Sequence, residues 1–237
     1  MTTFLLVHGA WHGGWSWKKL TPLLQAAGHQ IFNPTLTGLG ERAHLLSPAV
    51  DLNTHIQDIL GVLECEDLTG VVLVGHSYGG VVITAVAEKA PERLAHLVYL
   101  DAFVPQDGQS LFDFLLDDQR HSFEEQARTV GDGWRLPPPQ LKVWGITADE
   151  DIRWMSSRVG DHPLKTFTEP VRLSNPAAAA LPRTFISCTA HPRPALVATA
   201  SRLRTDPTWR YRELFAGHDA MVTEVQKTAG LLLEAAA

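Results

Sequence analysis

Short apolar runs alternate with longer segments of helical periodicity in two parts of the chain, about 4–101 and from 183 onward. Short runs of strand character, continuously apolar at 4–7 and 71–74, predict strands at 4–8, 30–32, 71–74, 97–101, 183–188 and 210–214. Apolar positions at helical spacing predict helices at about 17–27, 52–66, 80–88 and 195–204, and a last one from about 223. Strands and helices that alternate in this way form a parallel sheet flanked by helices. We therefore predict an α/β fold with a mostly parallel sheet of about six strands.

The alternation stops between residues 104 and 180. This stretch holds three consecutive prolines at 137–139 and many large apolar side chains. A disordered linker would not carry so much apolar surface, so we predict an inserted helical cap that closes over a pocket. The chain then divides into a first core segment, 1–103, a cap, 104–180, and a second core segment, 181–237. The large apolar residues of the cap are Phe112, Phe114, Leu115, Trp134, Trp144, Trp154, Met155 and Phe167.

The apolar run at 71–74 ends in a turn of small residues that has a serine at its apex. Glycines stand two residues before and two residues after Ser77. This spacing leaves room for a strained strand-to-helix turn, which lifts a serine hydroxyl clear of the sheet. A serine attacks effectively when a base lies beside it and backbone N–H groups stabilise the resulting oxyanion. We expect Ser77 to be a catalytic nucleophile.

Eleven histidines could serve as the base, and position favours His218. It follows the last predicted strand, at the carboxyl edge of the sheet, where catalytic groups collect in parallel sheets and where Ser77 is also expected. A carboxylate must orient the imidazole, because the wrong tautomer costs about 10⁴ in rate. Asp101 ends the strand after the serine helix and is our candidate, with Asp206, in a turn before the last strand, as the alternative. Asp219 adjoins His218 and is badly placed to bind its ring.

Composition narrows the range of partners and compartments. The formal net charge of −6 gives no electrostatic reason to expect nucleic acid or an anionic membrane as a partner. The chain starts without a basic leader and has no apolar stretch of ~18 residues, so we expect a soluble, cytoplasmic protein. Two cysteines are too few for a disulfide scaffold or a zinc site, and we expect no metal. The sequence does not fix the oligomeric state, for which a homodimer is one option.

Three stretches of the chain together carry a resemblance to a known family. They are His-Gly-Ala-Trp-His-Gly-Gly-Trp-Ser-Trp at 8–17, Val-Gly-His-Ser-Tyr-Gly-Gly at 74–80 and Gly-His-Asp-Ala-Met at 217–221. They resemble the α/β-hydrolase superfamily, in particular the branch of plant methylesterases and hydroxynitrile lyases and the related bacterial carboxylesterases and pyrethroid hydrolases. The resemblance implies an α/β-hydrolase fold and an oxyanion hole formed by the backbone N–H groups of Ala10 and Tyr78.

The chain departs from this family at the third catalytic position. Relatives have an aspartate just after the strand that matches 183–188, whereas this chain has Thr-Ala-His-Pro at 189–192. Some α/β-hydrolases have their acid after the strand that precedes the cap, which is where Asp101 stands. The resemblance is therefore compatible with Asp101 as the orienting carboxylate.

These residues predict hydrolysis of a carboxylic ester through an acyl-enzyme, with no cofactor. The aromatic cap favours a small hydrophobic ester with an aryl or alkyl group. The residues that we expect to line the substrate pocket are Trp11, His12, Phe103, Trp134 and Trp154.

Two other functions stay open at this point. A hydroxynitrile lyase of the resembling branch has a threonine beside the first-loop histidine and a lysine after the catalytic histidine, where this chain has Gly9 and Asp219. Asp219 would put a negative charge where a departing cyanide needs a positive one, which argues against a lyase. A non-catalytic protein that binds a small ligand on a hydrolase scaffold is the second alternative. The absence of the usual aspartate favours it, and the presence of Ser77 and His218 argues against it.

Overall fold

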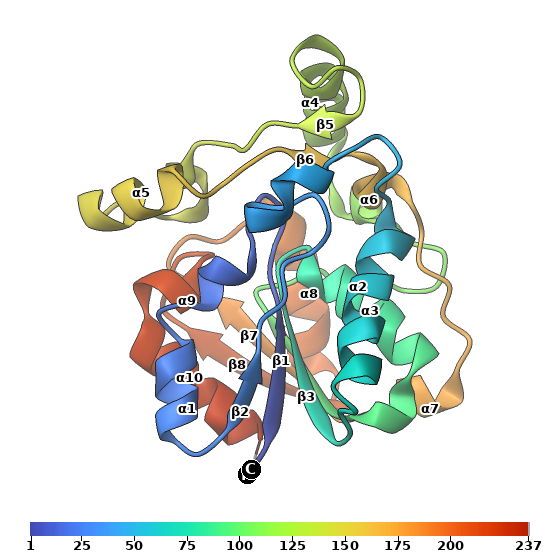
Figure 1. Ribbon diagram of the computed structural model, residues 1–237, viewed down its shortest axis with the longest axis vertical. Coiled ribbons are helices and arrows are strands. Elements are labelled where there is room, and N and C mark those ends of the chain that lie inside the picture. The colour runs from blue at the N-terminus through green and yellow to red at the C-terminus, as the bar shows by residue number, and fades with distance from the viewer. Residues whose placement is uncertain (237) are drawn as a thin grey trace.

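The computed structural model describes residues 1–236, so residue 237 of the predicted second core segment lies outside the described residues. Six parallel strands form one sheet in the order β2-β1-β3-β4-β7-β8 (Figure 1). This confirms the predicted parallel sheet of about six strands. The strands are β1 (Thr3–Val7), β2 (Gln30–Phe32), β3 (Val71–His76), β4 (Leu94–Leu100), β7 (Arg183–Cys188) and β8 (Trp209–Leu214).

Helices cover both faces of this sheet. In Figure 1, α1 and α10 lie together on one face, and α2, α3 and α8 lie on the other. A capping box starts α2, in which the Asp51 carboxylate accepts a hydrogen bond from the Thr54 N–H at 2.8 Å. The helices of this core are α1 (Thr21–Ala26), α2 (Leu52–Cys65), α3 (Gly79–Lys89), α8 (Pro194–Thr205), α9 (Ala220–Thr223) and α10 (Val225–Ala235).

The hydrophobic core is centred on β3, whose six residues are all buried. A strand that is covered on both faces has no solvent side, which explains why 71–74 is a continuous apolar run instead of an alternating one. Because the strands are parallel, the carboxyl ends of β3, β4, β7 and β8 lie at one edge of the sheet. Ser77 follows β3, Asp101 follows β4, Arg193 comes after β7 and His218 comes after β8.

The segment between β4 and β7 adds no strand to the six-stranded sheet. In Figure 1 its elements α4, β5, β6 and α6 lie over the carboxyl end of β1, and α5 extends to one side. β5 and β6 pair only with each other, antiparallel. Two-residue strands are too short to show alternation, so the sequence pattern did not indicate them. The elements are α4 (Asp117–Thr129), β5 (Arg135–Leu136), α5 (Asp149–Ser156), β6 (His162–Pro163), α6 (Lys165–Thr168) and α7 (Pro176–Ala179).

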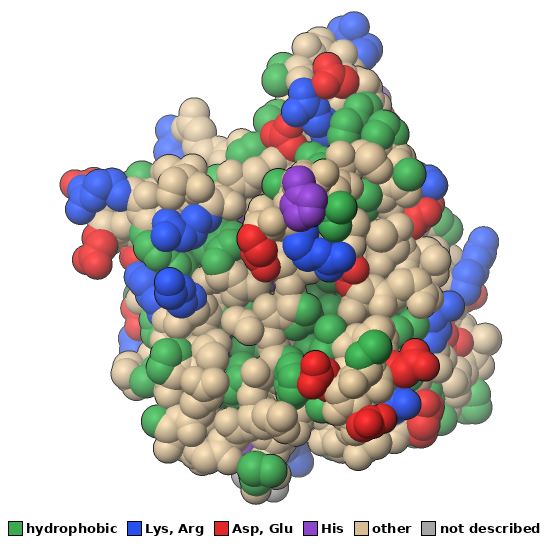
Figure 2. All heavy atoms as spheres, in the orientation of Figure 1, with side chains coloured by type: hydrophobic (Ala, Val, Ile, Leu, Met, Phe, Trp, Pro, Cys, Tyr) green, Lys and Arg blue, Asp and Glu red, His purple; other side chains and the backbone are tan. Residues whose placement is uncertain are grey.

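Basic and acidic side chains are interspersed on the face shown in Figure 2, and neither sign dominates it. Among residues 1–236, no helix combines the length and the apolar character that crossing a membrane requires.

Candidate active site

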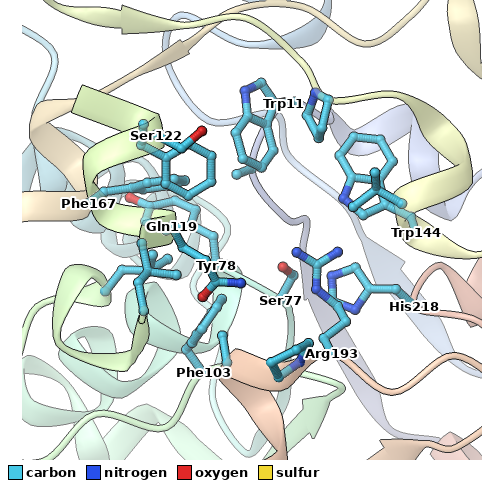
Figure 3. Close-up of a pocket in the computed structure, with 18 of the residues that line it drawn as sticks. Trp11, Ser77, Tyr78, Phe103, Gln119, Ser122, Trp144, Phe167, Arg193 and His218 are labelled. Carbon is cyan, nitrogen blue, oxygen red and sulfur yellow. The ribbon is translucent and has the colours of Figure 1, made fainter. Parts of the chain in front are cut away.

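Ser77 stands between β3 and α3 in a left-handed backbone conformation, with a φ of 54°. For a residue other than glycine, this conformation costs about 1–3 kcal/mol. The flanking glycines make the turn sterically accessible. A Cβ at Gly75 would lie 2.6 Å from the carbonyl oxygen of Gly79, and one at Gly79 would lie 2.6 Å from that of Val7. The turn points the Ser77 side chain into a cavity between the sheet edge and the cap (Figure 3).

His218 reaches the same cavity from the loop after β8. The main-chain N–H of His218 donates to the Trp144 carbonyl at 2.9 Å. The Nε2–H of His76 donates to the carbonyl oxygen of His218 at 3.0 Å. The main-chain N–H and the carbonyl oxygen of His218 are thus both hydrogen-bonded, which fixes the position of its main chain. The ring lies beside Ser77 in Figure 3, and both residues line the cavity.

Asp101 holds the far side of the His218 ring. Its Oδ2 accepts a hydrogen bond from Nδ1 of His218 at 2.6 Å, and its Oδ1 accepts one from the Cys188 N–H at 3.1 Å. Asp101 is 4% exposed and also has a left-handed backbone, with a φ of 42°. Because the carboxylate accepts from Nδ1, the ring proton is fixed there and Nε2 is left as the acceptor.

The pKa shifts of this pair set its protonation state at neutral pH. Burial raises the pKa of Asp101 to about 6, against the lowering effect of the Cys188 N–H. Burial lowers the pKa of His218 well below its usual value, and the nearby Arg193 cation lowers it further. The imidazole is therefore neutral and the carboxylate mostly ionised near pH 7, which is the state that accepts a proton.

The cavity has a volume of about 550 Å³, which is in the range of pockets for small organic ligands. Three of the five predicted pocket residues, Trp11, His12 and Phe103, line it. Trp134 and Trp154, which were also expected there, do not line this cavity.

These two tryptophans pack elsewhere on the cap, against cations. The Trp154 ring lies between Lys19 and Arg158, at 5.3 Å and 5.1 Å from its centroid. The Trp134 ring lies 6.0 Å from the Arg135 guanidinium. Both rings therefore pack against cations, a role that sequence cannot distinguish from pocket lining.

Other cap residues take their place in the cavity wall. Trp144, Phe123 and Phe167 line it, together with the polar side chains of Gln119 and Ser122 from α4. Phe123 and Phe167 lie with their ring centroids 6.0 Å apart. Trp144 and Phe167 belong to the apolar residues on which the predicted cap rested.

Trp11 connects the first loop of the core to the cap. Its Nε1–H donates to the Leu136 carbonyl at 2.9 Å, and its main-chain N–H donates to Nδ1 of His162 at 3.3 Å. These bonds reach β5 and β6, so the cap position depends on the loop that carries Ala10. The indole is 6% exposed and closes one side of the cavity.

Ala10 and Tyr78, the two expected oxyanion donors, both line the cavity with Ser77. Tyr78 immediately precedes α3, where backbone N–H groups have no acceptor within the helix ladder. The positive end of the helix dipole adds to the attraction for negative charge at this point. Their arrangement is compatible with the donor role that the resemblance implies.

Asp206, the alternative carboxylate, lies away from His218. It precedes β8, at the opposite edge of the sheet, and accepts hydrogen bonds from the N–H and hydroxyl of Thr208 at 2.9 Å and 2.6 Å. It thus caps an exposed turn.

Asp219 is a site residue that the sequence did not identify. It is fully buried, and its Oδ1 lies 3.4 Å from Nε2 of His12 and 3.6 Å from Nε2 of His76. Burial alone would lower the pKa of His12, but the Asp219 carboxylate raises it above its usual value. Adjacency to His218 was the only signal in the sequence, and it does not reveal the contact with His12.

Comparisons with known proteins agree with this architecture. The model of the "Alpha/beta hydrolase family" matches residues 4–233. The chain is 38% identical to the carbendazim hydrolyzing esterase of Nocardioides sp., over 94% of each chain. It is 30% identical to salicylic acid-binding protein 2 of Nicotiana tabacum, over 98% of this chain and 96% of that one. The structure of an extracellular α/β-hydrolase from a Paenibacillus species matches with a TM-score of 0.87 and 25% identity, over 99% of both chains. The chain belongs to the α/β hydrolase family.

Proposed function

We propose that this chain hydrolyses carboxylic esters through an acyl-enzyme formed on Ser77. The observation that carries the proposal is the 2.6 Å hydrogen bond between His218 and the buried carboxylate of Asp101, at a cavity that Ser77 also lines. A neutral imidazole beside a serine, with its proton held on the far nitrogen by a carboxylate, is the arrangement that general-base activation requires.

In the acylation step, Nε2 of His218 takes the hydroxyl proton as Oγ of Ser77 attacks the ester carbonyl. The negative charge on the carbonyl oxygen is stabilised by the N–H groups of Ala10 and Tyr78. Donors of this kind contribute roughly 3 kcal/mol each to the transition state. Asp101 stabilises the imidazolium that forms, and His218 then protonates the departing alcohol.

In the deacylation step, His218 takes a proton from a water molecule that attacks the acyl-enzyme. The second tetrahedral intermediate uses the same two N–H groups. Its collapse releases the carboxylic acid and returns the proton to Oγ of Ser77, so the enzyme is regenerated without a cofactor.

The relatives and the charge distribution support an ester substrate. The carbendazim hydrolyzing esterase is an esterase by name and matches over 94% of both chains. The buried Asp219 carboxylate next to His218 disfavours release of an anion such as cyanide, which argues against the lyase alternative. The aromatic lining favours a small ester with a hydrophobic aryl or alkyl group. A cytoplasmic location stays a prediction, since one structural relative is extracellular by name.

Turnover of 4-nitrophenyl esters of short-chain acids tests the proposal. We expect wild type to hydrolyse them and Ser77→Ala and His218→Ala to lose at least ~10⁴ in kcat/KM. Ser201→Ala, which changes an exposed serine on α8, is the matched control and should keep wild-type activity. If wild type hydrolyses no ester but binds a hydrophobic ligand tightly, the ligand-binding alternative replaces this proposal.

A further inference from the structure

The cavity contains a cation that the proposed mechanism does not use. Arg193 lies in the loop between β7 and α8, and its side chain lines the cavity together with Ser77 and His218. In Figure 3 its guanidinium extends alongside the His218 ring toward the part of the cavity that holds Ser77. A positive charge at this place does not help proton transfer, because it lowers the pKa of the base.

Arg193 has no partner in the described part of the chain. Its Nη1 is buried, and no acceptor among residues 1–236 binds it. The carboxylate of Asp101, whose charge acts on Arg193 most strongly, already accepts from His218 and from the Cys188 N–H. Arg193 is half-buried, and a buried guanidinium nitrogen without an acceptor is costly, so a ligand that brings an acceptor to it gains from binding here.

The backbone holds Arg193 rigidly. Prolines precede and follow it, and its φ of −99° and ψ of 121° lie in the extended region that a residue before proline prefers. The loop is anchored to the end of the sheet, since the Ala190 N–H donates to the Ala216 carbonyl at 3.0 Å. The main chain thereby fixes the point from which the Arg193 side chain enters the cavity, and the planar fork of a guanidinium suits two-point binding of a carboxylate.

The other walls of the cavity define the remainder of the ligand. Trp11, Phe103, Phe123, Trp144 and Phe167 form apolar surface. The one acidic residue of the lining, within the described residues, is Asp118 of the cap, and it is exposed to solvent, where its charge is screened. The cavity thus pairs an arginine next to the nucleophile with a largely aromatic enclosure, in which Gln119 and Ser122 add polar side chains.

We propose that Arg193 binds a carboxylate on the substrate, so that the preferred substrates are hydrophobic half-esters, which have one ester bond to cleave and one free carboxylate. This inference rests on the proposed ester hydrolysis and names its substrate class. The carboxylate orients the ester in the cavity, and the apolar remainder contacts the aromatic wall.

Two esters of equal acyl length test the proposal by kinetics. Mono-4-nitrophenyl adipate has the free carboxylate and 4-nitrophenyl hexanoate lacks it, and the spontaneous hydrolysis of each is subtracted. We expect the ratio of kcat/KM for adipate over hexanoate to fall by at least about 10-fold in Arg193→Met, as expected for loss of a charge-assisted hydrogen bond. Arg193→Lys keeps the positive charge but loses the paired N–H donors of the guanidinium, so its ratio should lie between those of wild type and Arg193→Met.

Arg210→Met is the matched control, because it removes an exposed cation at the start of β8, away from the cavity. It should keep the wild-type ratio, and thermal melts check that each variant is folded. A wild-type ratio in folded Arg193→Met overturns the proposal.

A binding measurement separates this inference from the proposed function. Titration calorimetry of the Ser77→Ala protein compares monomethyl adipate with methyl hexanoate, which this variant should not cleave. We expect adipate to bind at least about 10-fold more tightly, and the preference to vanish when Arg193→Met is added. If wild type cleaves neither 4-nitrophenyl ester but this preference is found, ester hydrolysis fails and the carboxylate site stands. Equal binding of the two methyl esters overturns the carboxylate site.

Discussion

Replacing Asp101 by asparagine keeps the shape of the side chain and removes its charge. In the wild type the carboxylate lies 2.6 Å from Nδ1 of His218, where it would face the imidazolium of the proposed mechanism. For unit charges about 4 Å apart at an effective dielectric constant of about 20, this attraction is about 4 kcal/mol. Its loss from the transition state corresponds to a factor of about 10³ in rate.

The asparagine variant also changes the tautomer of the base. The Cys188 N–H, which donates to Oδ1 of Asp101 at 3.1 Å, would hold the amide oxygen on its own side. The amide NH₂ group would then face Nδ1 of His218 and donate to it. This moves the ring proton to Nε2, where it blocks proton transfer from Ser77.

We therefore expect Asp101→Asn to lower kcat/KM by about 10⁴, and Asp101→Ala, which imposes no tautomer, by about 10³. The assay is hydrolysis of 4-nitrophenyl butyrate, with circular dichroism to confirm that the variants are folded. Asp206→Asn, in the exposed turn, should stay within about two-fold of wild type. A folded Asp101→Asn with more than a tenth of wild-type activity, or a larger loss in Asp206→Asn, would refute this assignment.

Two further predictions concern the pH profile and the cavity wall. kcat/KM should fall as the pH drops below about 6, because burial raises the pKa of Asp101 to about 6 and its protonation removes the charge that stabilises the imidazolium. A pH–rate profile checks this, and constant activity down to about pH 5 would contradict it. Phe123→Ala should raise KM for an aryl ester about 10-fold, since the ring is partly buried in the cavity wall. Trp154→Ala, outside the cavity, should keep KM within about two-fold of wild type. Equal changes of KM in the two variants would contradict the assignment of Phe123, and not Trp154, to the cavity wall.

The sequence predicts those site residues whose positions follow from strand ends. Ser77, Asp101 and His218 each come directly or shortly after a strand of a parallel sheet, and such ends meet at one edge whatever the side-chain packing. This rule was sufficient to choose Asp101 over Asp206, which precedes its strand. The catalytic roles of these residues are the subject of the proposal and of its tests.

The rest of the site depends on packing that periodicity does not encode. Asp219 contacts His12 because the chain turns inward after His218, and nothing local specifies that direction. The aromatic residues of the cap were identifiable as buried, but pocket-facing Trp144 and cation-contacting Trp154 have the same sequence character. Arg193 carries no motif of its own, and it occupies the loop in which relatives have the aspartate.

In the proposed mechanism, ester cleavage passes through an acyl group on Ser77. Mass spectrometry of the protein, quenched in acid during turnover of a 4-nitrophenyl ester and digested, tests this directly. We expect one added acyl group on the peptide that contains Ser77, formed in wild type, absent from Ser77→Ala and accumulating in a burst with the first equivalent of nitrophenol. Steady turnover by wild type with no acyl group on Ser77, or with the acyl group on another residue, would contradict it.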